Sequence, residues 1–425
     1  MASADVQEKI ERAPMPLPQI VRTFWLWSLI AFVAMIAIGV VEFRMGYPKP
    51  HYSPLGGSRY DDLTEYLPTY KLLHTTAFFG NPVTTPVAYP PLGAVMYAVD
   101  YASGHPVGFY LMTALVWLLA GVWGVRRALL VYGIGGLTAT LFPLTVVLLS
   151  FPIAGLIQRG NIELFLWVFA ACGTWAYVRD KDDAAAVLWG LAAAMKLYPI
   201  IFLALLLPRR KYRAFAGGVG TFVAASVASM AWLGPSIAVA WKGSLHNVFG
   251  YQGVRVSEWS IHELAANHSM YGLAKIVAIC VNLPLSKLML PYYATGAVVF
   301  GLLFFRRLWR LPMANQLLAV SAFMVMLPPV SYFYTLVHLY APWLVLVFVA
   351  IRAARAGVRI PGLQTTILLF VPLFGSFMLF TYPRVMLFGG LVQGCMLILL
   401  FLCAVTFPFV EPVFPAQKMP EALAA

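Results

Sequence analysis

Charged side chains are scarce in this sequence. Only 11% of its 425 residues are Asp, Glu, Lys or Arg, whereas 61% are hydrophobic, and the mean hydropathy is +0.81. A typical soluble domain carries about 25% charged residues, and a water-soluble globule of this composition would expose large apolar patches. The composition therefore excludes an ordinary soluble globule. It predicts an integral membrane protein, because apolar stretches of roughly 20 residues can each span a bilayer as a helix.

Cysteine is also rare, and no metal-ligand motif is present. The four cysteines lie in apolar segments without disulfide or ligand spacing, so we expect them to be small core hydrophobes. His262, Glu263 and His268 stand close together, but their spacing matches no zinc motif. The sequence therefore predicts no metal and no other cofactor.

Basic residues occur in short clusters between apolar runs: Arg126-Arg127, Arg209-Arg210-Lys211, Arg306-Arg307 and Arg352-x-x-Arg355. A net charge of +13 could suggest nucleic acid as a partner, but a nucleic-acid surface needs a continuous basic face. Such clusters instead mark the cytoplasmic loops of membrane proteins. Threading the apolar runs alternately from a cytoplasmic N-terminus puts all four clusters inside. We therefore predict a protein of the bacterial inner or plasma membrane, with both termini in the cytoplasm and no nucleic acid as partner.

The apolar runs predict the fold class. There are about a dozen of them, so the expected fold is all-α and integral to the membrane, with about 12 transmembrane helices. No internal repeat is apparent. We predict a single transmembrane domain over residues 22–410, flanked by cytoplasmic tails at 1–21 and 411–425.

Two long segments, 44–105 and 234–288, fall on the extracytoplasmic side of this threading. Each contains a moderately apolar stretch that is too short to span, at 92–103 and at 270–284. We expect these stretches to be interfacial helices that lie on the membrane surface. Because the other loops are short, the functional site is predicted on the extracytoplasmic face.

Three carboxylates follow the first apolar run, in the segment Asp61-Asp62-Leu63-Thr64-Glu65-Tyr66, although the whole chain has only 16 acidic residues. If this segment is helical, Asp61 and Asp62 point about 100° apart, whereas Asp62 and Tyr66 share a face. One carboxylate can then face a protein interior while its neighbour faces water. The inward carboxylate is a candidate general base for a hydroxyl group, and a solvated loop helix is the alternative.

Two cations are candidates for binding an anion: Arg159 lies at a predicted membrane entry, and Lys196 lies inside an apolar run. Arg159, followed by Gly160 and Asn161 at the start of an apolar run, offers a cation and free backbone N–H groups to an anion, unless Arg159 merely snorkels. Lys196 lies within an apolar run, where a lysine costs roughly 2.5–3.5 kcal/mol on insertion scales. Pro199 interrupts the run, so residues 199–208 are expected to form a half-helix, and the break suits a phosphate group. The alternative for Lys196 is an ion pair with Glu163 across helices.

The second long segment interleaves aromatic with polar side chains: Trp259, His262, Asn267, His268 and Ser269. Aromatic rings pack on the apolar faces of sugar rings, so this composition suits sugar binding. Ser331, Tyr332 and His338 cluster at another predicted outer junction between helices. There His338 is either a phosphate-binding group or a hydrogen-bonded helix histidine.

The order of these motifs resembles the GT-C superfamily, and within it glycosyltransferase family 87, the polyprenyl-phosphate-mannose-dependent α-mannosyltransferases. Four pieces carry the resemblance: Asp62-x-x-x-Tyr66, Tyr89-Pro90-Pro91-Leu92, Arg159-Gly160-Asn161, and the run from Gly190 to Pro199 followed by Pro208-Arg209-Arg210. Asn267-His268-Ser269-Met270 and Pro328-Pro329-Val330-Ser331-Tyr332 resemble two later motifs more loosely. The family often has Asn-Gln-Ser in place of the first, and it places a histidine nearer to Tyr334 than to His338.

The resemblance implies an inverting transfer of a sugar, by default mannose, from a polyprenyl phosphate to an acceptor hydroxyl on a glycolipid or glycan. It implies Asp62 as the base, with Asp61 as the alternative, and no metal. The implied donor-phosphate ligands are Lys196, Arg159 and His338. The implied substrate-binding residues are Tyr66, Tyr89, Asn161, Glu163, Tyr198, Trp259, Asn267, His268, Ser269 and Tyr332.

A transporter or flippase of a lipid-linked or anionic substrate is the main alternative from another class, because it would share the broken helix and the intramembrane lysine. It would be expected to have two related halves, which the sequence lacks. A ligase that moves a lipid-linked glycan is a further alternative. The transferase interpretation is favoured because the long loops all lie on one side.

Overall fold

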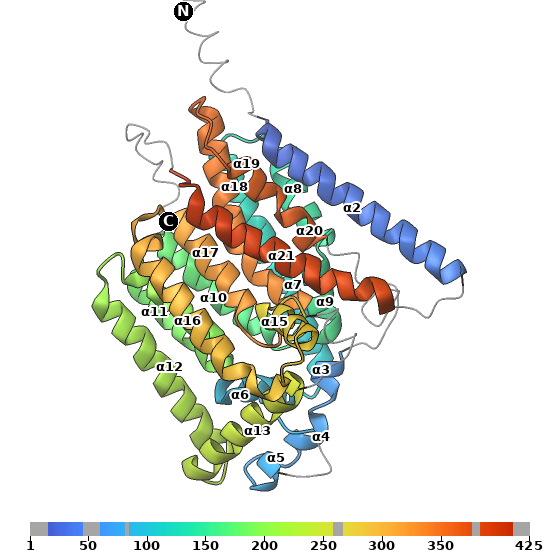
Figure 1. Cartoon of the computed structure of the whole chain (residues 1–425), viewed down its shortest axis with the longest axis vertical. Helices are drawn as coiled ribbons and strands as arrows, with labels where there is room; N and C mark the ends of the chain where they lie inside the picture. The colour runs from blue at the N-terminus through green and yellow to red at the C-terminus, as the bar shows by residue number, and fades with distance from the viewer. Residues whose placement is uncertain (1–15, 46–59, 81–84, 258–266, 376–382, 411–425) are drawn as a thin grey trace, which may run out of the picture.

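The computed structural model describes residues 16–45, 60–80, 85–257, 267–375 and 383–410, and apart from one isolated bridge its regular elements in these ranges are helices (Figure 1). The first half contains α2 (Gln19–Arg44), α3 (Asp61–Thr64), α4 (Leu67–Tyr70), α5 (Ala77–Gly80), α6 (Pro91–Ala102), α7 (Pro106–Val131), α8 (Gly136–Leu148), α9 (Phe151–Arg159), α10 (Glu163–Val178), α11 (Asp182–Met195), the 3-10 helix η1 (Tyr198–Leu206) and α12 (Tyr212–Leu233).

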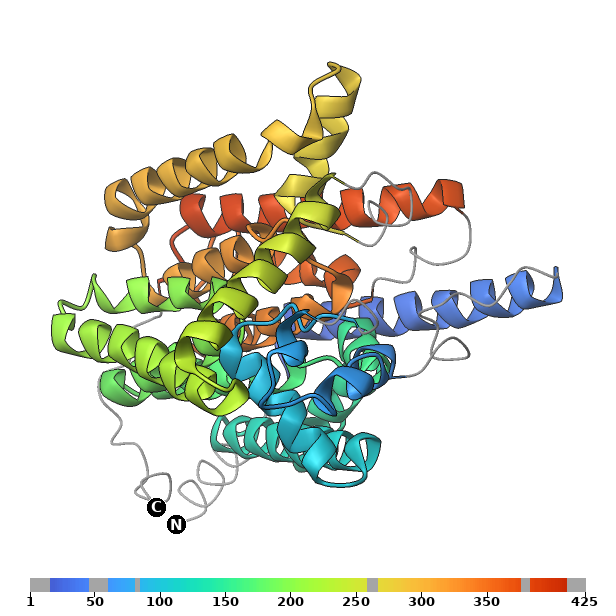
Figure 2. The same cartoon turned by 90° about the horizontal axis from the view of Figure 1, so that it is seen from below.

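The second half contains α13 (Ile237–Ser257), α15 (Met270–Cys280), η2 (Leu285–Lys287), α16 (Met289–Arg306), η3 (Leu308–Arg310), α17 (Met313–Met326), η4 (Phe333–Leu339), α18 (Tyr340–Arg355), α19 (Leu363–Leu368), α20 (Phe370–Phe374) and α21 (Pro383–Thr406). The C-terminal half of α2 and the first part of α21 extend beyond the rest of the bundle (Figures 1 and 2).

Several helices are long and apolar enough to cross a membrane. Four qualify by length and hydropathy, namely α7, α12, α16 with η3, and η4 with α18. The pair α8 and α9, bent by 53°, makes a fifth if it is one broken span. Shorter apolar helices within α2, α10, α15, α17, α19–α20 and α21 accompany them. The chain is therefore an all-helical integral membrane protein, and the count of about 12 spans stays a prediction.

The chain breaks at Lys196, as the sequence suggested. Helix α11 ends at Met195, Lys196 is extended (φ −147°, ψ 138°), and Pro199 occupies the first turn of η1. The expected half-helix is a 3-10 helix of nine residues. A 3-10 helix rises about 2.0 Å per residue against 1.5 Å in an α-helix, so η1 covers more depth than its length suggests.

Helices α13 and α9 were not expected. The predicted loop 234–288 is largely helical, because α13 occupies 21 of its residues and packs against α5, α12 and η2. Helix α9 begins where Ser150 caps it, its side chain accepting from the backbone N–H of Ile153 at 3.0 Å, and Pro152 stands in its first turn. The bend before α9 brings Arg159 to the start of α10.

The ends of the helices separate into two groups. Two of the ends that carry basic clusters contact neighbouring helix ends: Arg352 donates to the Tyr132 hydroxyl at 2.9 Å, and Arg307 donates to the Val405 carbonyl at 3.1 Å. At the other end of the bundle, α3 meets the end of α9 and the start of α10. The side of the membrane on which each group lies stays a prediction.

Two hydrophobic clusters stabilise the bundle. The larger surrounds α17, whose residues are buried along its whole length, and includes parts of α18 and α21. The smaller joins the first loop to α6, α9 and the start of α10. The second cluster supports the polar residues described next.

Candidate functional site

The loop after α2 is fastened to the end of α9. The backbone N–H of Tyr60 donates to the Gln158 carbonyl at 2.7 Å, and Tyr60 has a left-handed backbone (φ 61°) before α3 begins. Gly160 ends α9 with φ +66°, and a Cβ there would lie 2.9 Å from Leu63. A glycine is therefore required both by the backbone angle and by the close approach of α3.

The two adjacent aspartates differ in environment. Asp62 is buried, with 6% of its surface exposed, whereas the side chain of Asp61 is 37% exposed. Tyr66 is buried as well. Asp62 therefore faces the protein interior, and Asp61 lies at the rim.

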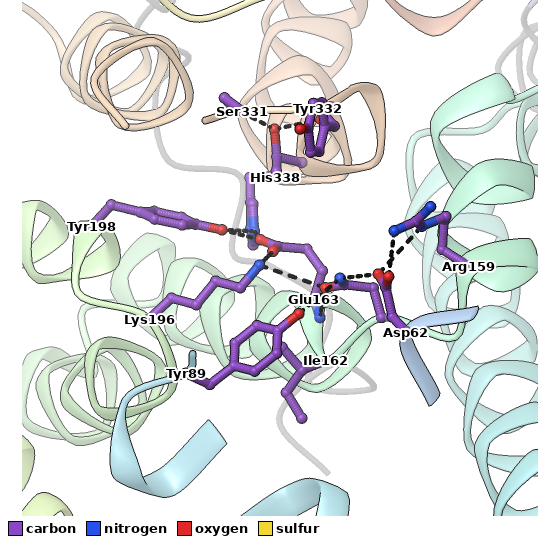
Figure 3. A network of polar contacts seen from close by, with 12 residues as sticks. Asp62, Tyr89, Arg159, Ile162, Glu163, Lys196, Tyr198, Ser331, Tyr332 and His338 are labelled. Atoms are coloured by element: carbon purple, nitrogen blue, oxygen red, sulfur yellow. Dashed lines mark hydrogen bonds and ion pairs between the residues drawn. The ribbon is translucent and has the colours of Figure 1, made fainter. Parts of the chain in front are cut away.

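Asp62 is held by three N–H donors (Figure 3). Arg159 binds it through two nitrogens, with Nε 3.3 Å from Oδ2 and Nη2 paired with Oδ1. The Asn161 amide donates to Oδ2 at 2.5 Å. Asp61 lies farther from Arg159, at 3.9 Å from Nη1 to its Oδ2. A two-nitrogen grip of this kind fixes the orientation of a carboxylate as well as its position.

Asn161 connects the aspartate to the lysine. Its Nδ2 donates to Asp62 and lies 3.3 Å from the Tyr89 hydroxyl. Its Oδ1 accepts from the backbone N–H of Glu163 at 2.9 Å and lies 3.5 Å from Lys196 Nζ. Both ends of the amide are therefore used, and one side chain spans the gap between an acid and a cation.

Glu163 is the centre of the second half of the network. It is fully buried, and its carboxylate accepts from Lys196, from the Tyr198 hydroxyl and from His338, whose Nε2 lies 2.6 Å from Oε1 (Figure 3). The ion pair with Glu163, left open as an alternative for Lys196, is present. A fully buried carboxylate needs such partners, because an unpaired buried charge is costly.

Lys196 also lies against aromatic rings. Its Nζ is 5.5 Å from the ring centre of Tyr89 and 5.8 Å from that of Tyr334. The lysine side chain is 16% exposed and that of Arg159 is 19% exposed, whereas Glu163 is not exposed at all. The two cations therefore reach the surface of the network, and Glu163 lies behind them.

A group of tyrosines supports the acidic end. The ring centres of Tyr66, Tyr89 and Tyr97 lie 5.4–5.8 Å apart in each pair, and the Tyr97 hydroxyl accepts from the Ile162 N–H at 3.2 Å. Asp100, one turn after Tyr97 on α6, is fully buried. Its carboxyl oxygens have no hydrogen-bond partner within the described ranges, and burial raises its pKa from 3.8 to about 7. Sequence reasoning did not single out Asp100.

The Asn267-His268-Ser269 segment was expected to bind substrate, but the structure buries it. Asn267 forms the isolated bridge with Tyr332, and its side chain donates to the Pro329 carbonyl at 2.8 Å. Ser269 caps α15 by accepting from the Gly272 N–H at 3.1 Å. These three side chains are at most 3% exposed. Their contacts are with the protein itself, so direct substrate binding by them is not what the geometry favours.

The other residues that were predicted to form the site fall into those that belong to the network and those that do not. Asp62, Tyr89, Arg159, Asn161, Glu163, Lys196, Tyr198 and His338 form one network, and Tyr66 packs against Tyr89. Tyr332 directly precedes η4, the 3-10 helix that carries His338, and it is partly exposed. Trp259 lies outside the described residues. Within the described ranges, no group of three or more His, Cys, Asp or Glu side chains could hold a metal ion.

The fold and this network define a polytopic membrane protein with a buried acid–cation centre at one end of its helices. The family model of glycosyltransferase family 87 matches residues 81–331, which is more than half of the chain. The chain therefore belongs to glycosyltransferase family 87, and this membership implies an enzyme that transfers sugar from a lipid-linked donor. No curated protein matches the chain. Most of the network lies within the matched residues, whereas Asp62 and His338 lie outside them.

Proposed function

We propose that this chain is an inverting glycosyltransferase that moves a sugar, with mannose as the first candidate, from a polyprenyl phosphate to an acceptor hydroxyl on the extracytoplasmic face. The observation that carries the proposal is the bridge made by Asn161. It joins a buried, oriented carboxylate, Asp62, to a cation, Lys196. A general base and a phosphate-binding cation are the two groups that such a transfer requires.

In the proposed reaction, Asp62 removes the proton of the acceptor hydroxyl. The acceptor oxygen forms a bond to the anomeric carbon from the side opposite the phosphate. The bond from that carbon to the phosphate oxygen breaks, and its electron pair leaves with the polyprenyl phosphate. One displacement of this kind inverts the configuration at the anomeric carbon.

The cations would act where negative charge builds up on the departing phosphate. Lys196 is the first candidate, because its ammonium group lies at the partly exposed side of the network. Arg159 has the second partly exposed cation, but its two-nitrogen grip on Asp62 makes it first of all the group that orients the base. His338 is a third candidate, and its Nε2 is bound to Glu163.

The test uses the purified protein in lipid nanodiscs, supplied with radiolabelled polyprenyl-phosphate-mannose and a membrane lipid extract. Wild type is compared with Asp62→Asn and with Asp61→Asn, the same chemical change at the neighbouring, exposed position. General bases contribute roughly 10²–10⁴-fold, so Asp62→Asn should lose at least about 100-fold in rate while Asp61→Asn keeps most of it. The anomeric configuration of the product, determined by NMR, should be opposite to that of the donor.

The other outcomes are equally informative. Loss of transfer with Asp61→Asn alone would keep the enzyme and move the base by one residue. Retention of configuration would exclude the single displacement. No transfer from any tested lipid-linked sugar by a folded wild-type protein would reject the proposal, and uptake of labelled lipid-linked substrates would then be measured for the transporter alternative.

A further inference from the structure

A second polar cluster, formed by His268, Ser331 and Thr335, lies behind the network. His268 Nε2 is 3.1 Å from Ser331 Oγ and 3.2 Å from Thr335 Oγ1, and the two hydroxyl oxygens are 2.9 Å apart. The exposed fractions are 0%, 1% and 5%. Three mutually bonded side chains that are this deeply buried do not contact solvent, and they join two segments more than 60 residues apart in the chain.

One arrangement of donors and acceptors satisfies every hydroxyl proton of the cluster. Thr335 Oγ1 donates its single proton to the Tyr332 carbonyl at 2.9 Å, so it can only accept from the other two groups. Burial lowers the pKa of His268 to about 3, so the ring is neutral. With Nε2 protonated, His268 donates to the hydroxyl oxygens and Ser331 donates to Thr335. Every hydroxyl proton in the cluster then has an acceptor.

The backbone reinforces the same junction. The His268 N–H donates to the Ser331 carbonyl at 3.0 Å, and Asn267 Oδ1 accepts from the Ser331 N–H at 3.0 Å. The segment before α15 is therefore bound to the turn that leads into η4. This backbone pairing fixes where η4 begins, and the side-chain cluster fixes how it is rotated about its axis.

The rotation of η4 matters because of what the helix carries. It is a 3-10 helix of seven residues, longer than the three or four that such helices usually reach, so it depends on tertiary contacts. Residues three apart in a 3-10 helix are eclipsed, which places Thr335 and His338 on one face. The contacts at Thr335 therefore set the direction of His338, whose Nε2 lies 2.6 Å from Glu163.

We propose that His268 is a positioning residue: with Ser331 and Thr335 it locks the rotation of η4 and thereby holds His338 against the Glu163–Lys196 pair. The proposal rests on the proposed function for its kinetic consequence, but the geometry that it asserts does not require sugar transfer. It also replaces the expectation that His268 contacts substrate.

A double-mutant cycle tests the kinetic consequence in the nanodisc transfer assay. His268→Leu should lower kcat/KM for the lipid-linked donor by about 10- to 100-fold, since it removes the ring nitrogen bonded to both hydroxyl groups and leaves Ser331 and Thr335 bonded only to each other and to the Tyr332 carbonyl. His268→Gln, whose amide nitrogen can take the place of Nε2, should recover most of that loss. In a His338→Gln background the additional effect of His268→Leu should fall to less than about threefold, because the residue that it positions is already gone. Full additivity would mean a purely structural role and would overturn the proposal.

A measurement without substrate separates this proposal from the proposed function. Hydrogen–deuterium exchange of residues 333–339 should be faster in His268→Leu than in wild type and unchanged in His268→Gln. Ser321→Ala is the matched control, since Ser321 on α17 is buried and its hydroxyl has no partner among the described residues. It should leave both exchange and transfer unchanged. Unaltered exchange of η4 in His268→Leu would overturn the positioning role even if transfer fell, and absent transfer by wild type would count only against the proposed function.

Discussion

The Glu163–Lys196 pair gives the sharpest prediction about stability. Replacing Glu163 by Gln keeps the shape and an oxygen acceptor for Tyr198 and His338, but it removes the negative charge opposite Lys196. Breaking a buried pair by removing one partner typically costs 3–5 kcal/mol. The Lys196 side chain is 16% exposed, so water relieves part of its charge. We therefore expect the free energy of unfolding to fall by about 3 kcal/mol, the lower end of that range.

The complementary variant leaves the other charge behind. Lys196→Met should also cost about 3 kcal/mol, because Glu163 is not exposed at all and retains only its hydrogen bonds to Tyr198 and His338. The double variant Glu163→Gln/Lys196→Met should cost far less than the sum, since neither charge remains. Coupling of this kind, about 2–3 kcal/mol, is expected of residues in direct contact.

Reversible unfolding in mixed micelles, followed by circular dichroism, measures these differences. Glu65→Gln is the matched control, because Glu65 is exposed and undergoes the same chemical change; it should lie within about 0.5 kcal/mol of wild type. If the two single variants were as stable as wild type, or if their effects added without coupling, the pair would not contribute to stability.

Three further predictions use other parts of the site. Asp100 holds its proton in the folded chain up to about pH 7, whereas an ordinary aspartate loses it near 3.8. Wild-type stability should therefore fall by up to about 4 kcal/mol as pH rises from about 4 to about 7, and Asp100→Asn should remove that part of the fall in a pH series of unfolding midpoints. Arg159→Lys cannot grip Asp62 through two nitrogens and should lower the transfer rate at least tenfold at unchanged net charge, as steady-state kinetics would show. Gly93→Val should disturb the end of α11 and reduce transfer, because a Cβ at Gly93 meets a backbone oxygen of α11 at 2.8 Å, whereas Gly121→Val, which meets nothing within 4 Å, should not.

Local structure could be predicted from the sequence where one residue type has one physical consequence. The apolar run interrupted at Pro199 predicted a break, and the chain does turn extended at Lys196. The spacing of Asp61, Asp62 and Tyr66 predicted that one aspartate faces inward, and the burial of Asp62 and Tyr66 agrees with that helical spacing. Such inferences need only the period of a helix and the cost of burying charge.

Pairing across the fold was harder to foresee. The sequence could name Glu163 as a possible partner of Lys196, but it could not decide between an ion pair and a free cation, since that depends on how α10 and α11 pack. The joining of His268 to Thr335 spans 67 positions and involves a plain hydroxyl with no motif around it. Substrate contact by His268 therefore stays a prediction, and the buried contacts favour the positioning role proposed above.

The prediction of element type was also wrong where the composition of a segment fits both a helix and a loop. Helix α13 exposes Trp241 and Phe249 while it buries Ser244 and Asn247, the reverse of the pattern of a soluble helix. Mixed polarity of this kind resembles a loop in sequence. Helix α13 therefore lacks the one-sided apolar pattern of an amphipathic helix, and its sequence carries no helical signal of that kind.

The distribution of charge in the network bears on how the proposed transfer would be accelerated. Both cations are already paired, Arg159 with Asp62 and Lys196 with Glu163. A lipid phosphate that arrives with one negative charge therefore meets a site that is close to neutral. In the proposed transfer the second charge would appear only as the bond to the anomeric carbon breaks, and Lys196 would respond by turning from Glu163, which would retain hydrogen bonds from Tyr198 and His338. Interactions that strengthen only at that point lower the barrier rather than tighten donor binding. On this proposal Glu163 would belong to the mechanism although it is fully buried, because the hydrogen bonds that it accepts from Tyr198 and His338 would offset part of the cost of losing Lys196.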